Sequence, residues 1–152
     1  MGLDMYLQKE VFIGANYKHR GITGVIEIKQ DDKPIAINFS RVSSITEEVG
    51  YWRKANQIHK WFVDNVQGGK DECQRSYVEP EQLLKLLSLC EQVLADKTKA
   101  KDLLPNSEGF FFGAQEYTDY YFADLQDTIK IIKELKLEES DMNGEYYYRA
   151  SW

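Results

Sequence analysis

Residues 51–67, YWRKANQIHKWFVDNVQ, form the stretch in which the pattern of the chain changes from strand to helix. Apolar side chains recur there every three to four residues and project within about 80° of one another, which predicts an amphipathic helix. They are Tyr51, Ala55, Ile58, Phe62 and Val66. Two glycines at residues 68–69 are expected to end this helix, because glycine readily adopts the left-handed conformation of a helix C-terminus.

Ahead of this stretch, apolar and polar residues alternate with the period of two that is typical of half-buried strands. Residues 3–13 form the first such segment, and residues 22–29 and 34–38 form two more on either side of a polar turn at 30–33. We therefore expect one strand followed by a β-hairpin, with Pro34 at the start or the edge of a strand.

Two further helices and a last strand are expected downstream. Pro80, a residue favoured in a first helical turn, opens a helix that ends near Ala95. A longer apolar stripe predicts a helix from about Thr118 to Leu137. Residues 145–152 alternate again and predict a strand that closes the sheet beside the first strand.

This order of elements differs from the strict alternation of strands and helices in a parallel nucleotide-binding sheet. The expected fold class is α+β, with an antiparallel sheet of the N-terminal strands plus the C-terminal strand packed against about three helices. A length of 152 residues and an apolar fraction of 43% fit a single domain over residues 1–152.

Charge and composition exclude several function classes. The chain carries 19 basic and 25 acidic residues, so we expect no general nucleic-acid binding, which needs surplus Lys and Arg. Residues 1–6 lack the pattern of a signal peptide, and no window has the apolar length of a membrane span. We expect a cytoplasmic protein without membrane attachment, in which Cys73 and Cys90 are reduced thiols.

The stretch 51–62 also supplies the densest set of candidate site residues. On the face opposite the apolar stripe, helical spacing places cationic and amide side chains, with a tryptophan beside them. They are Arg53, Asn56, Gln57, Lys60 and Trp61. Arginine binds phosphate or carboxylate, amides bond to the edge of a base or sugar, and an indole stacks on a base. These residues predict a site for a small anionic, nucleotide-like ligand; the alternative is an ordinary solvated helix face.

Aromatic residues gather in the segment 109–122, which begins GFFFG. Phe111, Tyr117 and Tyr120 are candidates for an interface with a partner protein, to which the acidic second half of the chain would present a negative surface. A fully buried strand at the GFFFG block and an ordinary solvated acidic surface are the alternatives.

A catalytic role depends on His59, because histidine is the side chain that changes charge near neutral pH. A histidine close to an apolar stripe is either an acid or base, or a residue packed in the core. The chain has two histidines and no HExxH or paired Cys-x-x-Cys motif, so neither a metal nor a cofactor is expected. An enzyme with an unrecognised site is the third function class.

Three motifs carry a family resemblance: GLDMYL at residues 2–7, YWRKANQIHKWF at 51–62, and GFFFG with the tyrosines that follow it. Together they resemble small proteins encoded by tailed bacteriophages and prophages. The resemblance implies a bacterial host cell as the setting and implies no catalytic residue. It suggests an accessory protein that counters host defence, either by sequestering a nucleotide signal or by occupying a defence protein. A homo-oligomer is compatible with both, and in the first case the ligand site would lie at its interface.

Overall fold

A four-stranded antiparallel sheet forms the centre of the computed structural model, which describes residues 2–107, 116–139 and 144–152. The strands lie in the order β4-β1-β6-β5, so the first and last strands of the chain are neighbours. Their bounds are Asp4–Phe12 for β1, Ser44–Arg53 for β4, Ser76–Val78 for β5 and Glu145–Ser151 for β6. The predicted α+β class is confirmed, including the C-terminal strand beside the first one.

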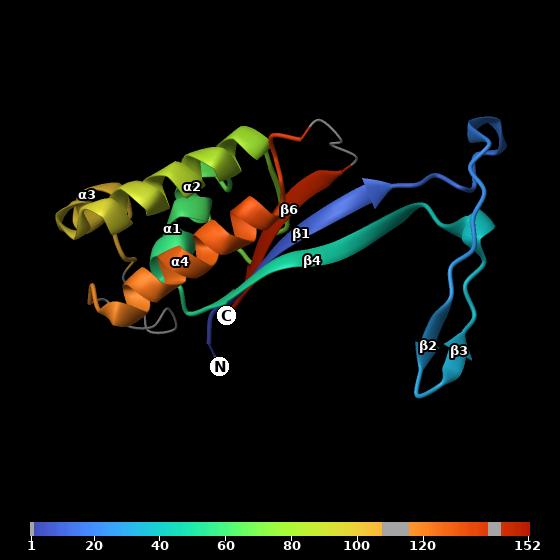
Figure 1. Cartoon of the computed structure of the whole chain (residues 1–152), viewed down its shortest axis with the longest axis horizontal. Helices are drawn as coiled ribbons and strands as arrows, with labels where there is room; N and C mark the ends of the chain where they lie inside the picture. The colour runs from blue at the N-terminus through green and yellow to red at the C-terminus, as the bar shows by residue number, and fades with distance from the viewer. Residues whose placement is uncertain (1, 108–115, 140–143) are drawn as a thin grey trace.

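The helices lie together on one face of this sheet (Figure 1). Among the described residues they are α1 (Asn56–Asn65), α2 (Pro80–Ala95), α3 (Ala100–Leu103) and α4 (Asp119–Glu134). The predicted helix that opens at Pro80 is confirmed, and α4 is shorter at its end than the predicted span 118–137. The short elements α3 and β5 have no counterpart in the prediction.

The covered face of the sheet supplies the core. Every second residue is buried at residues 3–7, where the first strand begins, and along β6. These residues are Leu3, Met5, Leu7, Tyr146, Tyr148 and Ala150. Phe62 of α1 stacks on the Tyr148 ring with 3.9 Å between the ring centroids and 6° between the ring planes. This stack joins α1 to the middle of the sheet and fixes the position of the helix.

The first predicted helix is wrong at its start. It begins at Asn56, whereas residues 44–53 form β4, a strand that pairs with β1 and aligns Met5 with Trp52. The chain turns from strand to helix at Ala55, whose φ of −76° and ψ of 72° describe an inverse γ-turn closed by Asn56 N–H donating to Lys54 O at 2.9 Å. Pairing with β1 therefore overrides the helical spacing of residues 51–55.

The end of α1 follows the prediction. Gly68 and Gly69 have φ of 65° and 77°, and the Gly69 N–H donates to Val63 O at 2.8 Å. These left-handed residues satisfy a carbonyl in the last turn of the helix.

Residues 13–43, which we call the arm, leave the sheet where β1 ends and return where β4 begins (Figure 1). The predicted hairpin is present in the arm as β2 (Ile28–Gln30) and β3 (Lys33–Ile35), which form a two-stranded sheet of their own. Asp31 and Asp32 have φ of 50° and 61°, as a two-residue hairpin turn requires. The hairpin strands are shorter than predicted and do not extend the main sheet.

No helix in the described part of the chain is both long and apolar enough to span a bilayer. The two longest, α2 and α4, have 16 residues each.

Candidate ligand-binding site

A cavity of about 290 Å³ lies where the end of β4, the first turn of α1 and the first turn of α4 meet. Its polar lining includes two cations, two amides and two carboxyl groups. These are Arg53, Lys54, Gln57, Asn106, Glu116 and Asp124. Residues more than 60 positions apart in the sequence thus contribute to one polar cavity.

The junction between β4 and α1 places the two cations. Lys54 has a left-handed φ of 59°, and its backbone N–H donates to Leu3 O at 2.8 Å. Arg53 is exposed and lies 3.9 Å from Asp4 through its Nε, a distance that leaves its guanidinium in a loose ion pair. A left-handed conformation at a residue other than glycine is strained, and such strain concentrates at functional sites.

Gln57 and Asp124 form the polar floor of the cavity. The Gln57 Nε2 group donates to Asp124 Oδ2 at 3.1 Å and to Tyr121 O at 3.2 Å. Burial raises the pKa of Asp124 to about 6, the hydrogen bond from Gln57 lowers it in part, and the charge of Asp127 raises it. A carboxyl group with a raised pKa in a cavity is typical of a functional site.

Two helices begin at the cavity. α1 follows Ala55, which has no polar side chain, and α4 follows Thr118, whose side chain makes no capping hydrogen bond. Gln57 in the first turn of α1 and Tyr120 in the first turn of α4 both line the cavity. Backbone N–H groups and the helix dipole make a helix N-terminus favourable for an anion.

A hydrogen-bond chain through the core fixes α4 against the sheet. The buried Trp52 Nε1 donates to Thr128 Oγ1 at 2.9 Å, and Thr128 Oγ1 donates to Asp124 O at 2.7 Å. The Tyr121 hydroxyl donates to Leu104 O at 2.7 Å. These bonds hold the first turns of α4 in register with β4, so the cavity has a defined shape.

The structure places only part of the predicted ligand set in this cavity. Arg53 and Gln57 line it. Asn56 is 1% exposed and accepts a hydrogen bond from Ser107 N–H at 3.3 Å, Lys60 pairs with Asp64 at 2.8 Å, and Trp61 is 5% exposed. The expected polar helix face, with Arg53, Asn56, Gln57 and Lys60 on it and Trp61 beside it, is wrong, because Arg53 lies on β4 and the two amides are buried.

Of the three residues predicted to contact a partner protein, one lines the cavity and is exposed, one is half-buried, and one lies outside the described residues. Tyr120 lines the cavity and is 83% exposed. Tyr117 is half-buried and packs on Tyr121 with 4.9 Å between ring centroids. Phe111 and the rest of the GFFFG block lie outside the described residues.

His59 lies in the core, as one of its two interpretations predicted, and is 2% exposed. Its Nδ1 is 2.7 Å from the Tyr148 hydroxyl, and its Nε2 is 2.7 Å from Asp71 Oδ2, which also accepts from Trp152 Nε1 at 2.9 Å. Both ring nitrogens therefore bond within the protein. No group of three or more His, Cys, Asp or Glu side chains in the described ranges is arranged to hold a metal ion.

Sequence reasoning missed Lys54, Thr118 and Asp124 as site residues. Helical spacing alone places Asp124 on the outer or flanking side of its helix. The only feature of the sequence that indicates its burial is its spacing of three residues from the apolar Tyr121.

Comparison of the chain with protein-family models, with curated proteins and with solved structures found no match.

Proposed function

We propose that this protein is a non-catalytic binder of a small anionic, nucleotide-like ligand in the cavity between β4, α1 and α4. The observation that carries the proposal is the convergence of Arg53 and Lys54 with the starts of two helices around one cavity. Cations and helix N-termini are both favourable for a phosphate group.

The other lining residues fit the remainder of a nucleotide. Asp124 presents a carboxyl group suited to the edge of a base, and Gln57 holds that carboxyl group in place by donating to it. The exposed ring of Tyr120 offers an aromatic surface for stacking. In this arrangement the phosphate lies toward Arg53 and Lys54, and the base lies between Tyr120 and the floor.

Size and charge narrow the ligand class. A cavity of about 290 Å³ is at the lower end of the range for small-molecule sites, which favours a mononucleotide over a dinucleotide. Glu116 and Asp124 offset the two cations, so a ligand with one or two negative charges fits better than a triphosphate. Nucleoside monophosphates and cyclic mononucleotides meet both conditions.

The resemblance to phage proteins suggests what ligand binding by this protein would do in the cell. In a bacterial cytoplasm, a small protein that binds a mononucleotide without turnover would sequester it, and sequestering a signal nucleotide would counter host defence. That resemblance, carried by the motifs at residues 2–7 and 51–62, is the support for this step.

Thermal unfolding with a panel of nucleotides tests the proposal. A ligand at a hundred times its Kd stabilises the folded state by about 2.7 kcal/mol, which raises the Tm of a domain of this size by about 5–10 °C. We expect such a shift with at least one nucleoside monophosphate or cyclic mononucleotide, and its loss in Arg53→Ala and Lys54→Ala.

Lys60→Ala is the matched control, because Lys60 is a cation of the same segment that pairs with Asp64 and does not line the cavity. Its Kd should equal that of the wild type. Absence of a shift with every nucleotide in the panel, or equal weakening by Lys60→Ala and Arg53→Ala, would contradict the proposal.

The exposure of Tyr120 favours a second candidate, in which the same surface binds a partner protein. Tyr120→Ala would then abolish a pull-down of that partner from host lysate without changing the Tm. Capture of that partner by Tyr120→Ala at the wild-type level would exclude this candidate.

A further inference from the structure

The amide of Gln57 lines the cavity between β4, α1 and α4 and has an acceptor without a partner among the described residues. Gln57 is 2% exposed. Its Nε2 donates one hydrogen to Tyr121 O and the other to Asp124 Oδ2, so the orientation of the amide is fixed. Its Oε1 makes no hydrogen bond to residues 2–107, 116–139 or 144–152. Buried polar groups almost always have a partner, and a donor on a ligand would supply this one.

The carboxylate of Asp124 supplies a second acceptor to the same cavity. Its Oδ2 accepts from Gln57, and its Oδ1 makes no hydrogen bond within the described part of the chain. A pKa of about 6 leaves the group ionised at neutral pH, and an ionised carboxylate only accepts hydrogen bonds. Gln57 Oε1 and Asp124 Oδ1 are thus two acceptors on groups that are hydrogen-bonded to each other.

The charged groups around Asp124 leave its Oδ1 available to a ligand. Burial is the main cause of its raised pKa, and the charge of Asp127 on the same helix adds to it. Glu116 lines the cavity ahead of α4, and Arg53 and Lys54 line it at the end of β4. Within the described residues, no ion pair joins either cation to Asp124. Two N–H donors from a ligand would therefore stabilise the ionised carboxylate.

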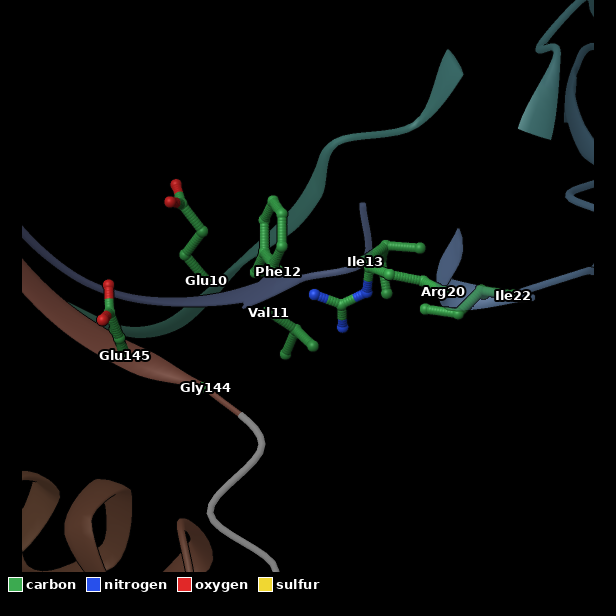
Figure 2. Close-up of a pocket in the computed structure, with 8 residues that line it drawn as sticks. All are labelled: Glu10, Val11, Phe12, Ile13, Arg20, Ile22, Gly144 and Glu145. Carbon is green, nitrogen blue, oxygen red and sulfur yellow. The ribbon is translucent and has the colours of Figure 1, made fainter. Parts of the chain in front are cut away.

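A larger groove, of about 730 Å³, lies at the root of the arm and offers no such acceptors (Figure 2). None of its lining residues is buried. Glu10 bonds to Arg75 at 3.0 Å, and Glu145 accepts from a tyrosine hydroxyl at 2.6 Å. The Arg20 guanidinium lies over the Phe12 ring, 4.9 Å from its centroid. The buried acceptors without partners thus distinguish the smaller cavity.

Two neighbouring acceptors select among the nucleotide bases. Guanine carries two adjacent donors on its Watson–Crick edge, N1–H and the 2-amino group. Adenine and cytosine present one amino donor beside an acceptor nitrogen, and uracil presents one N–H between two acceptors. A site built to bond to a donor rejects an analogue that lacks it, because the buried acceptor is then left unpaired.

We propose that the ligand of this cavity is a guanine mononucleotide, whose N1–H and 2-amino groups donate to Asp124 Oδ1 and Gln57 Oε1. This inference rests on the proposed function, because it takes the cavity to bind a nucleotide. Contacts of the phosphate with Arg53 and Lys54, and of the ring with Tyr120, are open to every nucleotide. Gln57 and Asp124 are therefore the residues that determine which base is bound.

Isothermal titration calorimetry with guanosine, inosine and adenosine monophosphates at pH 7.5 tests the base. Inosine monophosphate lacks only the 2-amino group and should bind about 10-fold or more weakly than the guanine nucleotide, and adenosine monophosphate should bind more weakly still. Arg53→Ala should weaken all three by the same factor, since it acts on the phosphate. Binding of the adenine or inosine nucleotide as tightly as the guanine one would overturn the guanine assignment and leave the proposed function standing. No binding of any of the three would overturn both.

The ratio of guanine to adenine nucleotide affinity tests the role of Asp124. Asp124→Asn keeps an acceptor for Gln57 and places an N–H where Oδ1 lies, so the ratio should fall about 10-fold or more. The loss of charge acts on both nucleotides and cancels from the ratio. Asp127→Asn removes the same charge from an exposed position of α4 outside the cavity and should keep the wild-type ratio. An unchanged ratio in Asp124→Asn would overturn the proposal.

Protonation of Asp124 should act as the substitution does. With a pKa of about 6, about 97% of the carboxyl group is ionised at pH 7.5 and about 9% at pH 5, so the wild-type ratio should fall about 10-fold between these values. The phosphate titrates equally in both nucleotides and cancels. The ratio in Asp124→Asn should not change with pH. A wild-type ratio that is the same at pH 5 and pH 7.5 would overturn the assignment of Asp124 Oδ1 as an acceptor for the base.

Discussion

Replacement of Asp124 by Asn should stabilise the protein at neutral pH and remove part of its pH dependence. Burial raises the pKa of Asp124 to about 6 from an ordinary value of 3.8. The folded state thus binds a proton more tightly than the unfolded state does. Stability is therefore lost as the pH rises through the window from about 4 to about 6, and the loss is complete above that window.

The size of the effect follows from this shift. About two pKa units correspond to about 3 kcal/mol, and the half-buried carboxylate retains part of its hydration, which reduces the cost to about 1–2 kcal/mol. The amide that Asp124→Asn introduces keeps a carbonyl acceptor for Gln57 Nε2, so the variant removes the charge without removing the 3.1 Å hydrogen bond. The gain should therefore appear in the free energy of unfolding.

Urea unfolding of the wild type and Asp124→Asn at pH 4, 5 and 7.5 measures this difference. The two proteins should have similar stability at pH 4, and the variant should be more stable by about 1–2 kcal/mol at pH 7.5. The variant should also bind an anionic ligand more tightly at pH 7.5, because the carboxylate no longer repels it. A variant that is less stable than the wild type at pH 7.5, or a difference that is constant with pH, would refute the reasoning.

Three further substitutions or measurements address the core, the junction and the thiols. Thr128→Val removes the acceptor of the buried Trp52 Nε1 and should lower the free energy of unfolding by about 1–3 kcal/mol in urea titration, whereas Thr128→Ser, which keeps the hydroxyl, should lower it less. Lys54→Gly should have a free energy of unfolding about 1 kcal/mol higher than that of Lys54→Ala. Both variants remove the side chain, but only glycine adopts a φ of 59° without strain. Equal free energies of unfolding would show that the turn between β4 and α1 changes conformation in Lys54→Ala. A thiol reagent should label Cys73 in the folded protein and Cys90 only on unfolding, because Cys90 is buried and burial raises its pKa to about 12; labelling of both in the folded protein would place Cys90 outside the core.

The elements that the sequence predicts well are those whose apolar period matches one uninterrupted element. β1, α2, α4 and β6 are of this kind, and each buries residues at the spacing that its pattern shows. β4 is different, because the register with β1 shifts between Leu7 and Gln8, where Leu7 aligns with Gly50 and Gln8 with Glu48. The extra residue, Val49, reverses the inward and outward alternation within the strand. No single period of two runs through residues 44–53, so the strand does not show in the pattern.

Gly50 is a second feature of β4 that residue spacing does not predict. A Cβ atom at this position would lie 2.9 Å from the Ile131 side chain of α4 and 3.2 Å from Leu7 Cβ. The glycine is needed because a helix about 80 residues later packs against the strand at this point. That requirement depends on tertiary packing, which the spacing of residues near Gly50 does not express.

The candidate site was partly predictable for a related reason. Arg53 and Gln57 are four residues apart, so a helical interpretation and the actual strand-to-helix turn both bring them close together. Lys60 is three residues further along α1, where it pairs with Asp64 at 2.8 Å and does not line the cavity. The inverse γ-turn at Ala55 joins Arg53 on β4 to Gln57 on α1, so these two residues line one cavity although they belong to different elements. The burial of Gln57 by Asp124, 67 residues away, turns a polar helix residue into the floor of a cavity, and only packing of α4 on α1 determines this.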